Sequence, residues 1–430
     1  MMNSHSAILI LVTLAVVSLI DYIPRLILLS KKTNNVTPGY DKVPDYFIMP
    51  TVYGDISYLK NLHFLKKYGS RVIVCTSKYE TPEFYSAVRK TCRKYHLRYI
   101  CAELPKVKGQ PIKNAYTIYR GAFDNLYKLG AKKNTPCILI DADTYAFKNV
   151  NNLVRTFIAL KLDIASLRCE ASNPKNIIER LQAYEYRLAM DNRRMDPWLT
   201  SGACNMAKAS VFQRVFGRHS NFFAGGDVEI GKLAQVMGYK IGHINFTFYT
   251  EVPDNLRDWY HQRVIWFSGG VRHHVANIGS FGWHHFFILI YNSLIVYLLL
   301  PLRWIEVTNF PLTLVVLVVL SWIYSVVLTI GKGWQAVYLL LPFYAFLQSM
   351  IIIPIAMARY CKYAWRQRSL GLLNYDLSHY SFMMKTVFKA LNISTAAIIV
   401  LAAFEFTQIR FDYWYYHGTL FKDIFSTIVH

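Results

Sequence analysis

The stretch Cys137-Ile138-Leu139-Ile140-Asp141-Ala142-Asp143-Thr144 decides the fold. Its first four residues are apolar, and a short apolar run of this kind predicts a buried strand. Asp141 and Asp143 follow at the carboxyl end of that strand. Two carboxylates with this spacing can bind one hard cation, and Mg²⁺ or Mn²⁺ prefers oxygen ligands and bridges to phosphates. We therefore predict a metal site at Asp141 and Asp143, whereas a helix cap or a solvated loop is the simpler interpretation of an isolated D-x-D pair.

Three more apolar runs precede this strand, at residues 47–52, 71–75 and 98–103. The stretches between them include 56–68 and 82–95, which have helical periodicity. Strands that alternate with helices predict βαβ units and a largely parallel sheet. Ligands of such sheets bind at the carboxyl ends of the strands, which is where the D-x-D pair lies.

The composition limits the class of protein. Of the 430 residues, 53% are hydrophobic and only 17% are charged. Soluble globular proteins carry about 25% charged residues, so this low value predicts membrane segments. The apolar content excludes a disordered chain, and the length excludes a small disulfide scaffold. The net charge of +22 predicts contact with anions, and the seven cysteines, which include no C-x-x-C pair, favour reduced thiols over zinc ligands.

Long apolar runs lie at both ends of the chain. Residues 7–29 are long for a signal peptide and precede no small-residue cleavage site, so we predict a transmembrane anchor. Lys31 and Lys32 follow this anchor and predict that the next residues lie in the cytoplasm. Two further runs, at 283–300 and 311–330, are each close to the ~20 residues that cross a bilayer.

The run at residues 337–357 contains Pro342 and Pro354 and precedes a basic segment, 359–368. If this run crossed the membrane, the basic segment would lie outside, against the positive-inside rule. We therefore predict that the run lies on the cytoplasmic membrane face and that residues 390–403 cross instead. The predicted protein is integral to the membrane and multi-pass, with a cytoplasmic middle domain.

Two further motifs follow the D-x-D pair. Ala224-Gly225-Gly226-Asp227 precedes a helical stretch, and Gln262 begins a Q-x-x-x-W motif that ends at Trp266. In this order, and before apolar helices, the motifs resemble those of the membrane-embedded family-2 glycosyltransferases, which include the hyaluronan, chitin and cellulose synthases. The resemblance extends over residues 46–368, because the segment that includes residues 341–368 is similar to the interfacial segment of those enzymes.

The resemblance implies a GT-A-type α/β domain, with a mixed and mostly parallel sheet, inserted between transmembrane α-helices. The implied parts are an anchor, a cytoplasmic catalytic domain, interfacial helices with the Q-x-x-x-W motif, transmembrane helices and a C-terminal tail, at residues 1–40, 41–255, 256–282, 283–408 and 409–430. The fourth part includes an interfacial segment at about 335–385.

The resemblance also implies catalytic roles. Asp141 and Asp143 would hold the metal and the donor diphosphate, and Asp227 would be the general base. The chemistry agrees, because an acceptor hydroxyl must lose its proton as it attacks the anomeric carbon and a carboxylate can take that proton. A helix N-cap is the structural alternative for Asp227.

The family's Q-x-x-R-W motif holds the donor diphosphate through its glutamine and arginine. Gln262 matches the glutamine, but Ile265 stands at the arginine position. Arg263 or Arg272 would have to replace the arginine. On a helix, Arg263 would point about 160° away from Ile265 (two residues at ~100° each), so we favour Arg272 or His273.

Recognition of the nucleotide has two candidate regions. The family places an aspartate after its second strand to bind the base, and here Asp55 or Glu80 would have to serve. Lys106, Lys108 and Lys113 correspond to a basic segment near the diphosphate, where they would act as point charges. A solvated loop is an equally good interpretation of these lysines.

The acceptor side is implied by three positions. Trp266 would line the acceptor path, and Ser201 and Gly202 match an S-G segment on the acceptor side. Trp198 precedes this segment and would either stack on a sugar ring or pack in the core.

These features predict an inverting, membrane-integrated glycosyltransferase that uses a UDP-sugar and Mg²⁺ or Mn²⁺ to elongate and translocate a polysaccharide. One alternative is transfer of a single sugar to a lipid acceptor. Another is a catalytically weak homologue that acts as an assembly subunit. The predicted partners are a UDP-sugar, a glycan or lipid acceptor and membrane lipid, and no feature supports a nucleic-acid partner.

Overall fold

The computed structural model describes residues 35–36, 43–107, 109–219, 225–281, 319, 322 and 335–366. The chain divides into two compact units. The sheet unit comprises Arg25–Trp259 and Leu373–His379, and the helix unit comprises Met1–Pro24, Tyr260–Leu372 and Tyr380–His430.

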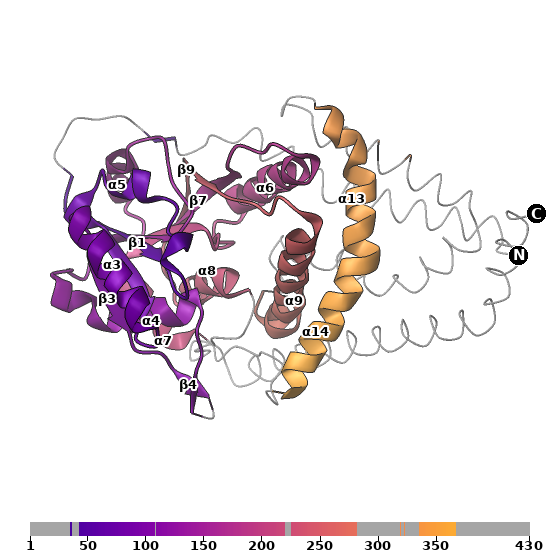
Figure 1. The fold of residues 1–430 in the computed structure, drawn as a ribbon. Helices are drawn as coiled ribbons and strands as arrows, with labels where there is room; N and C mark the ends of the chain where they lie inside the picture. The colour runs from indigo at the N-terminus through magenta and orange to yellow at the C-terminus, as the bar shows by residue number, and fades with distance from the viewer. Residues whose placement is uncertain are drawn as a thin grey trace, which may run out of the picture. The chain divides into compact units, whose positions relative to one another are not determined.

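The centre of the sheet unit is a seven-stranded sheet with the order β3-β2-β1-β6-β8-β7-β9. Figure 1 labels β1, β3, β7 and β9 of this sheet. Only β8 runs against the other six strands, so the predicted α/β domain with a mostly parallel sheet is confirmed. The strands are β1 (Phe47–Thr51), β2 (Ile73–Ser77), β3 (Arg98–Ala102), β6 (Pro136–Asp141), β7 (Ile164–Ala171), β8 (Cys204–Lys208) and β9 (Ile241–Thr250). The four predicted strands match β1, β2, β3 and β6 within two residues at each end.

Helices connect these strands. They are α2 (Leu62–Leu65), α3 (Pro82–Lys94), α4 (Ala115–Asn125), α5 (Val150–Ala159), α6 (Ile177–Met195), α7 (Ala209–Arg218) and α8 (Gly226–Val236). Short 3-10 turns, η1 (Ile56–Tyr58), η2 (Gly69–Arg71) and η3 (Leu126–Leu129), and a small hairpin of β4 (Lys106–Val107) and β5 (Gln110–Pro111) complete the unit. The prediction of a single helix at 56–68 was wrong. η1 and α2 are separate, and the buried Asn61 between them donates to the carbonyls of Asp141 and Thr144.

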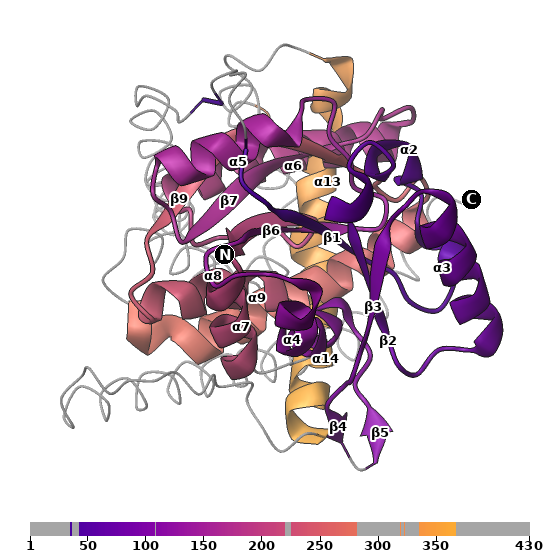
Figure 2. The ribbon, with the colours of Figure 1, turned by 90° about the vertical axis from the view of Figure 1, so that its left-hand side faces the viewer.

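The inner strands β1, β2, β6 and β8 pack on both faces of the sheet, because neighbouring side chains alternate. Phe47 and Met49 belong to the core under α4, α7 and α8, whereas Tyr46 and Ile48 belong to the core under α3 and α5. Figure 2 shows α5 and α6 on one side of the sheet and α4 and α7 on the other. Burial on both faces explains why these strands are continuous apolar runs in the sequence.

The strand order reverses between β1 and β6. The chain passes from β1 to β2 and β3 on one side, and β6 then pairs with the other side of β1, with Thr51 opposite Asp141. In sheets of this kind the ligand crevice opens at such a reversal, outside the carboxyl ends of the strands. The fold therefore places the chain after Thr51 and the chain after Asp141 at the edge where a ligand is expected.

The helix unit contains α9 (Leu256–Phe281), which begins four residues before the boundary between the units, and a series of short helices. These are η4 (Ala336–Leu340), α13 (Leu341–Leu347), a π turn η5 (Gln348–Ile352) and α14 (Ile353–Arg366). Pro342 and Pro354 are each the second residue of α13 and α14, and the backbone stays helical from the preceding η4 and η5 turns into these helices. The predicted segment at 337–357 is thus helical throughout.

Within the part of the chain that the structure describes, no helix has both the length and the apolar character needed to span a membrane. The four predicted spans, at 7–29, 283–300, 311–330 and 390–403, lie outside the described residues, apart from Val319 and Trp322.

Candidate active site

The turn after β6 carries the two aspartates of the D-x-D pair. The Thr144 N–H donates to the Asp141 carbonyl at 3.1 Å, which closes the turn. Asn61 is fully buried, and its Nδ2 donates to the carbonyls of Asp141 (3.1 Å) and Thr144 (2.7 Å) while its backbone N–H donates to Ala142. The sequence analysis missed Asn61, and nothing around it in the sequence marks it as a partner of this turn.

The end of β9 positions Asp143. The Thr250 Oγ1 donates to Asp143 Oδ1 at 3.1 Å, and Thr144 Oγ1 lies 3.3 Å from the same oxygen. Burial raises the pKa of Asp143, while the hydrogen bond from Thr250 acts in the opposite direction. A half-buried carboxylate that accepts a hydrogen bond from a hydroxyl has a fixed direction, which a metal ligand requires.

Asp227 lies in the first turn of α8. The N-cap residue of this helix is Gly225, whose φ of +72° suits glycine, so Asp227 is not the helix cap. The Thr200 hydroxyl donates to the Asp227 carbonyl. Backbone N–H groups of Val228 and Gly202 also act on the Asp227 carboxylate. The side chain of Asp227 is therefore held at the start of α8 without the capping role that was its structural alternative.

The three acidic side chains affect one another's charge. Burial, then the charges of Asp143 and Asp227, raise the pKa of Asp141 to about 8. Burial also raises the pKa of Asp227, against the attraction of Arg193 on α6. The structure thus brings together the three residues that the sequence analysis singled out, which we call the acid cluster: Asp141, Asp143 and Asp227. Among the described residues, none of the three makes an ion pair.

Tyr116 on α4 lies beside Asp227 because two glycines leave room for it. A Cβ on Gly226 would lie 2.6 Å from the Tyr116 ring, and a Cβ on Gly202 would lie 3.4 Å from its hydroxyl and 3.6 Å from Asp227 Oδ2. The Asp227 backbone N–H bonds to the Tyr116 hydroxyl. Burial, then the charges of Asp227 and Asp141, raise the pKa of Tyr116 well above its usual range, so the phenol is protonated.

The His219 ring packs against the Tyr116 ring. The two rings stack with centroids 5.2 Å apart, and the His219 Nε2 lies 3.0 Å from the Gly226 carbonyl and 3.6 Å from the Glu229 carboxylate. The side chains of His219 and Glu229 are completely buried. Neither Tyr116 nor His219 belongs to a motif, so the sequence analysis had no signal for them.

The S-G segment packs tightly against α8. A Cβ on Gly231 would lie 1.8 Å from the Trp198 carbonyl oxygen, and the Lys232 amine lies 5.4 Å from the Trp198 ring centre. Trp198 is only 3% exposed, which fits the packing alternative rather than stacking on a sugar. Ser201 is also buried, and its carbonyl accepts from Asn205. Gly202 is the member of this segment that faces Asp227.

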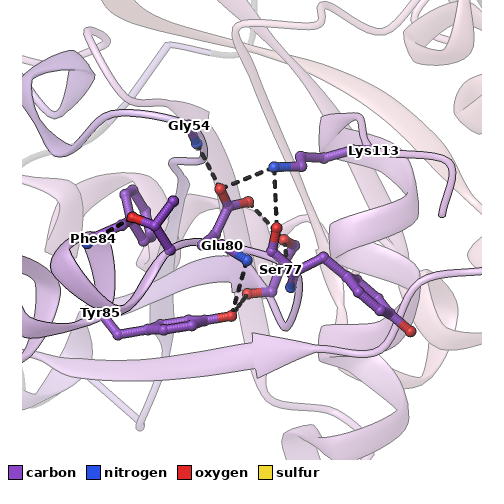
Figure 3. A network of polar contacts seen from close by, with 8 residues as sticks. Gly54, Ser77, Glu80, Phe84, Tyr85 and Lys113 are labelled. Carbon is purple, nitrogen blue, oxygen red and sulfur yellow. Dashed lines mark hydrogen bonds and ion pairs between the residues drawn. The ribbon is translucent and has the colours of Figure 1, made fainter.

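Glu80 lies at the centre of a second carboxylate network, shown in Figure 3. Glu80 Oε2 accepts from the Gly54 N–H at 3.0 Å and from Lys113 Nζ at 2.9 Å, and Oε1 accepts from Ser77 Oγ at 2.6 Å. We call these four residues the strand-end network, because Gly54 follows β1, Ser77 ends β2 and Lys113 follows β5. Asp55 is exposed, and its carboxylate caps η1.

The remaining predicted donor residues are less tightly held. Lys106 lies 5.4 Å from the Tyr79 ring centre, and Lys108 lies outside the described residues. Tyr53, which follows β1, is partly exposed, and its pKa is raised by burial, then by Asp141 and Glu80. Tyr53 is therefore close to both carboxylate networks at the crevice between β1 and β6, although the sequence analysis did not select it.

The Q-x-x-x-W motif lies on α9, in the helix unit. Arg263 is fully buried there, donates to Gln262 Oε1 at 2.8 Å and to the Tyr344 hydroxyl at 3.4 Å, and lies 4.2 Å from the Trp266 ring centre. Ile265 points the other way and is 38% exposed. The expected opposite directions of Arg263 and Ile265 are thus observed. The motif residues, however, gather around Arg263.

Arg272, the favoured alternative, is also fully buried in α9. The side chain of His273 lies outside the described residues. Nothing in the structure tests which of these basic residues acts on a diphosphate, so these roles stay predictions.

Comparison with known proteins places this chain in a family. The model of the glycosyl transferase family group 2 matches residues 137–353, just over half of the chain, and the match begins at the first residue of the stretch that ends in the D-x-D pair. No curated protein matches the chain.

Two solved structures are similar at low identity. The mannosyltransferase PcManGT from Pyrobaculum calidifontis, in complex with GDP-Man and Mn²⁺, is 14% identical with a TM-score of 0.46, over 92% of this chain and 97% of that chain. A putative glucose-1-phosphate thymidylyltransferase from Bacillus anthracis, in complex with a sucrose, is 10% identical with a TM-score of 0.29, over 47% of this chain and 88% of that chain. The family match, which spans β6, the acid cluster and α9, shows that the chain belongs to the glycosyl transferase family group 2 and is a glycosyltransferase.

Proposed function

We propose that this glycosyltransferase is an inverting enzyme that transfers a sugar from a UDP-sugar donor, with Asp227 as its general base. The observation that carries the proposal is the acid cluster, in which Asp141 lies within electrostatic reach of both Asp143 and Asp227 at the carboxyl edge of β6. One cluster thus offers both a place for the donor diphosphate and a base for the acceptor.

Asp227 has the properties that the base needs. Burial raises its pKa, and a carboxylate with a raised pKa takes a proton from a hydroxyl more readily. Its Oδ2 faces Gly202, where the absence of a side chain leaves space. In the proposed step the acceptor oxygen attacks the anomeric carbon and its proton passes to the Asp227 carboxylate. The bond from the sugar to the UDP oxygen breaks, and its electron pair stays on the diphosphate.

The acid cluster fits a divalent cation. Burial, then the charges of Asp143 and Asp227, raise the pKa of Asp141 to about 8, and a bound cation would offset the repulsion between these charges. Among the described residues, no three His, Cys, Asp or Glu side chains are grouped closely enough to hold a metal alone. Mg²⁺ and Mn²⁺ do not need such a cage, because one or two carboxylates and the substrate phosphates suffice. We propose that Asp141 and Asp143 hold the ion, which would stabilise the negative charge on the leaving diphosphate.

We further propose that the product is a polysaccharide, which the enzyme elongates and translocates as an integral membrane protein with its catalytic domain in the cytoplasm. The apolar runs at 7–29, 283–300, 311–330 and 390–403 support this proposal, as does the order of the motifs. Extraction of cell membranes with alkaline carbonate tests the membrane part. Release of the protein into the supernatant would contradict it.

Transfer of one sugar to a lipid acceptor is the second candidate. Ile265 favours it, because an exposed apolar side chain stands where the motif of the polymer synthases has an arginine. A purely structural role as an assembly subunit is less compatible with the acid cluster, since clustered buried carboxylates are costly unless they serve a function.

The test is a panel of UDP-sugars offered to the purified full-length protein with Mn²⁺, read by UDP release and followed by sizing of the product. A long polymer supports elongation, and a single-sugar lipid supports the second candidate. Absence of UDP release with every UDP-sugar would contradict the proposed donor class.

A further inference from the structure

A hollow of about 490 Å³ lies in the sheet unit apart from the acid cluster. On one side it is lined by Lys67, Tyr68 and Arg71, which follow α2. On the other side it is lined by Phe147, Asn149 and Asn151, at the start of α5. Its volume is within the range of small-molecule sites.

The hollow lies on the opposite face of the sheet from the helix that carries Asp227. Tyr68 packs against the core that contains Ala146 and Val150, under α3 and α5. Ile230 of α8 belongs to the core on the other face. No residue that lines the hollow belongs to the acid cluster or to the strand-end network, so neither site accounts for it.

The lining of the hollow is positively charged. It includes Lys67 and Arg71 and no acidic residue. Among the described residues, neither of these cations makes an ion pair. The N-terminus of α5, which is the positive end of the helix dipole, also lies at the hollow, and its first turn contains no acidic residue. An anion in this hollow would therefore meet only favourable charge.

The donors of the hollow are held in place. Arg71 lies 4.7 Å from the Tyr46 ring centre and donates to Asn151 Oδ1 at 3.3 Å, which fixes its guanidinium. The Tyr68 hydroxyl accepts from the Val150 N–H at 3.2 Å, which leaves its proton for another acceptor. A site with fixed donors loses little conformational entropy when a ligand binds.

An exposed aromatic ring stands at the rim. Phe147 is 75% exposed, and its ring packs against Tyr145 and Tyr249 at centroid distances of 5.4 and 4.9 Å. Its free face offers a broad apolar surface next to the cations. The pyranose ring of a sugar presents an apolar face of matching size.

We propose that this hollow is a second ligand site, which binds a phosphorylated sugar with its phosphate on Lys67 and Arg71 and its ring against Phe147. The proposal does not depend on the proposed donor or product of the enzyme. The same chemistry is offered by a soluble sugar phosphate and by the headgroup of a phosphorylated glycolipid, so the experiment has an arm for each.

Isothermal titration of the purified full-length protein with glucose 6-phosphate and with inorganic phosphate tests the site. Lys67→Gln is expected to weaken both ligands about tenfold or more, because it removes a charge-assisted hydrogen bond. Phe147→Ala is expected to weaken glucose 6-phosphate and to leave inorganic phosphate unchanged. Lys66→Gln is the matched control, since Lys66 is exposed, adjacent and outside the lining.

The second arm titrates the same full-length protein in detergent with the water-soluble dioctanoyl phosphatidylinositol 4-phosphate, and with dioctanoyl phosphatidylcholine as its control. Binding of the phosphorylated lipid that Lys67→Gln weakens identifies the lipid headgroup as the source, and binding of glucose 6-phosphate without binding of this lipid identifies the soluble sugar phosphate. The proposal is overturned if neither phosphorylated probe binds, or if Lys67→Gln binds them as tightly as the Lys66→Gln control. Lys67 is exposed, so its replacement tests binding and leaves the fold in place.

Discussion

Glu80 and Asp141 both follow parallel strands at the same edge of the sheet, but their surroundings differ. Glu80 accepts three hydrogen bonds within the strand-end network, one of them from the cationic Lys113 (Figure 3). Asp141 has no cationic partner among the described residues, and burial, followed by the charges of Asp143 and Asp227, raises its pKa to about 8.

The difference agrees with the proposed role of Asp141 in the reaction and favours a structural role for Glu80. The strand-end network is neutralised from within, so it joins the ends of β1 and β2 without any ligand. In the acid cluster the charges of Asp143 and Asp227 still act on Asp141, and a bound cation or a proton would relieve this repulsion. Buried carboxylates that repel one another are typical of sites that bind metal or transfer protons. The predictions below test this division between the two networks.

The largest effect is expected at the proposed base. Asp227→Asn removes the proton acceptor and keeps the shape of the side chain, so the transfer rate should fall by about 10²- to 10⁴-fold while UDP still binds. UDP release measures the rate, and titration with UDP and Mn²⁺ measures binding. Asp124→Asn on the exposed side of α4 is the control and should be fully active. Wild-type rates in Asp227→Asn would remove Asp227 from the mechanism.

A smaller loss is expected when the proposed metal ligand is removed. Asp143→Ala should weaken Mn²⁺-dependent UDP binding by about 10- to 100-fold, because even the outer partners of metal ligands contribute that much. The measurement is titration with UDP in the presence of Mn²⁺ and then of EDTA. The variant and the wild type should be alike in EDTA. Equal UDP affinities of the two in Mn²⁺ would show that Asp143 does not hold the ion.

Most of the central sheet could be predicted from the sequence, because a strand buried on both faces is a continuous apolar run. The runs at 137–141 and 98–103 were recognised in this way and correspond to β6 and β3. β7, β8 and β9 were not predicted. The antiparallel position of β8 between β6 and β7 depends on pairing between distant segments, and no local pattern encodes such pairing.

The acid cluster could be predicted because its members lie in motifs with a fixed order. The residues that hold the cluster in place could not be predicted, because they are common residue types that lie far from the motifs in the sequence. Asn61 is 80 residues from Asp141, and Thr250 is 107 residues from Asp143. Tyr116 reaches Asp227 only because Gly202 and a second glycine make room, and a glycine in a sequence does not reveal what will occupy the space beside it.

Tyr116 offers a test of these supports. Tyr116→Phe keeps the ring on His219 and removes the hydroxyl that bonds to the Asp227 backbone N–H, so kcat should fall about tenfold with little change in KM. A packing role alone would leave kcat and its pH profile unchanged. Tyr127→Phe is the control, because this exposed hydroxyl donates to the Gln213 side chain and lies on η3.

The strand-end network should respond in stability more than in chemistry. Glu80→Gln removes the negative charge that pairs with the Lys113 amine. It also places an amide NH₂ group opposite a hydrogen-bond donor, so the free energy of unfolding should fall by about 1–3 kcal/mol. Urea unfolding measures this change, and the transfer rate should fall far less than in Asp227→Asn. Glu83→Gln, an exposed acid on α3, should cost only a few tenths of a kcal/mol. If Glu80→Gln were as inactive as Asp227→Asn, the division between the two networks would be wrong.

The last prediction is a pH dependence of stability to which the acid cluster should contribute. The folded state raises the pKa of Asp141 to about 8, whereas an unfolded aspartate titrates near about 4. The folded protein therefore holds a proton more tightly than the unfolded chain between these values. The contribution of Asp141 to stability without metal should therefore fall as the pH rises from about 4 to about 8, and should level off above.

Thermal melting of EDTA-treated protein between pH 5 and pH 8 measures this slope. Asp141→Asn cannot lose a proton, so its slope should be shallower than that of the wild type, whereas Glu80→Gln should keep the wild-type slope on a lower curve. Added Mn²⁺ should raise the melting temperature more at pH 8 than at pH 5, because the ion competes with the proton for the same carboxylates. A slope that Asp141→Asn leaves unchanged would mean that the repulsion lies outside the acid cluster, and the contrast with the strand-end network would then lose its electrostatic basis.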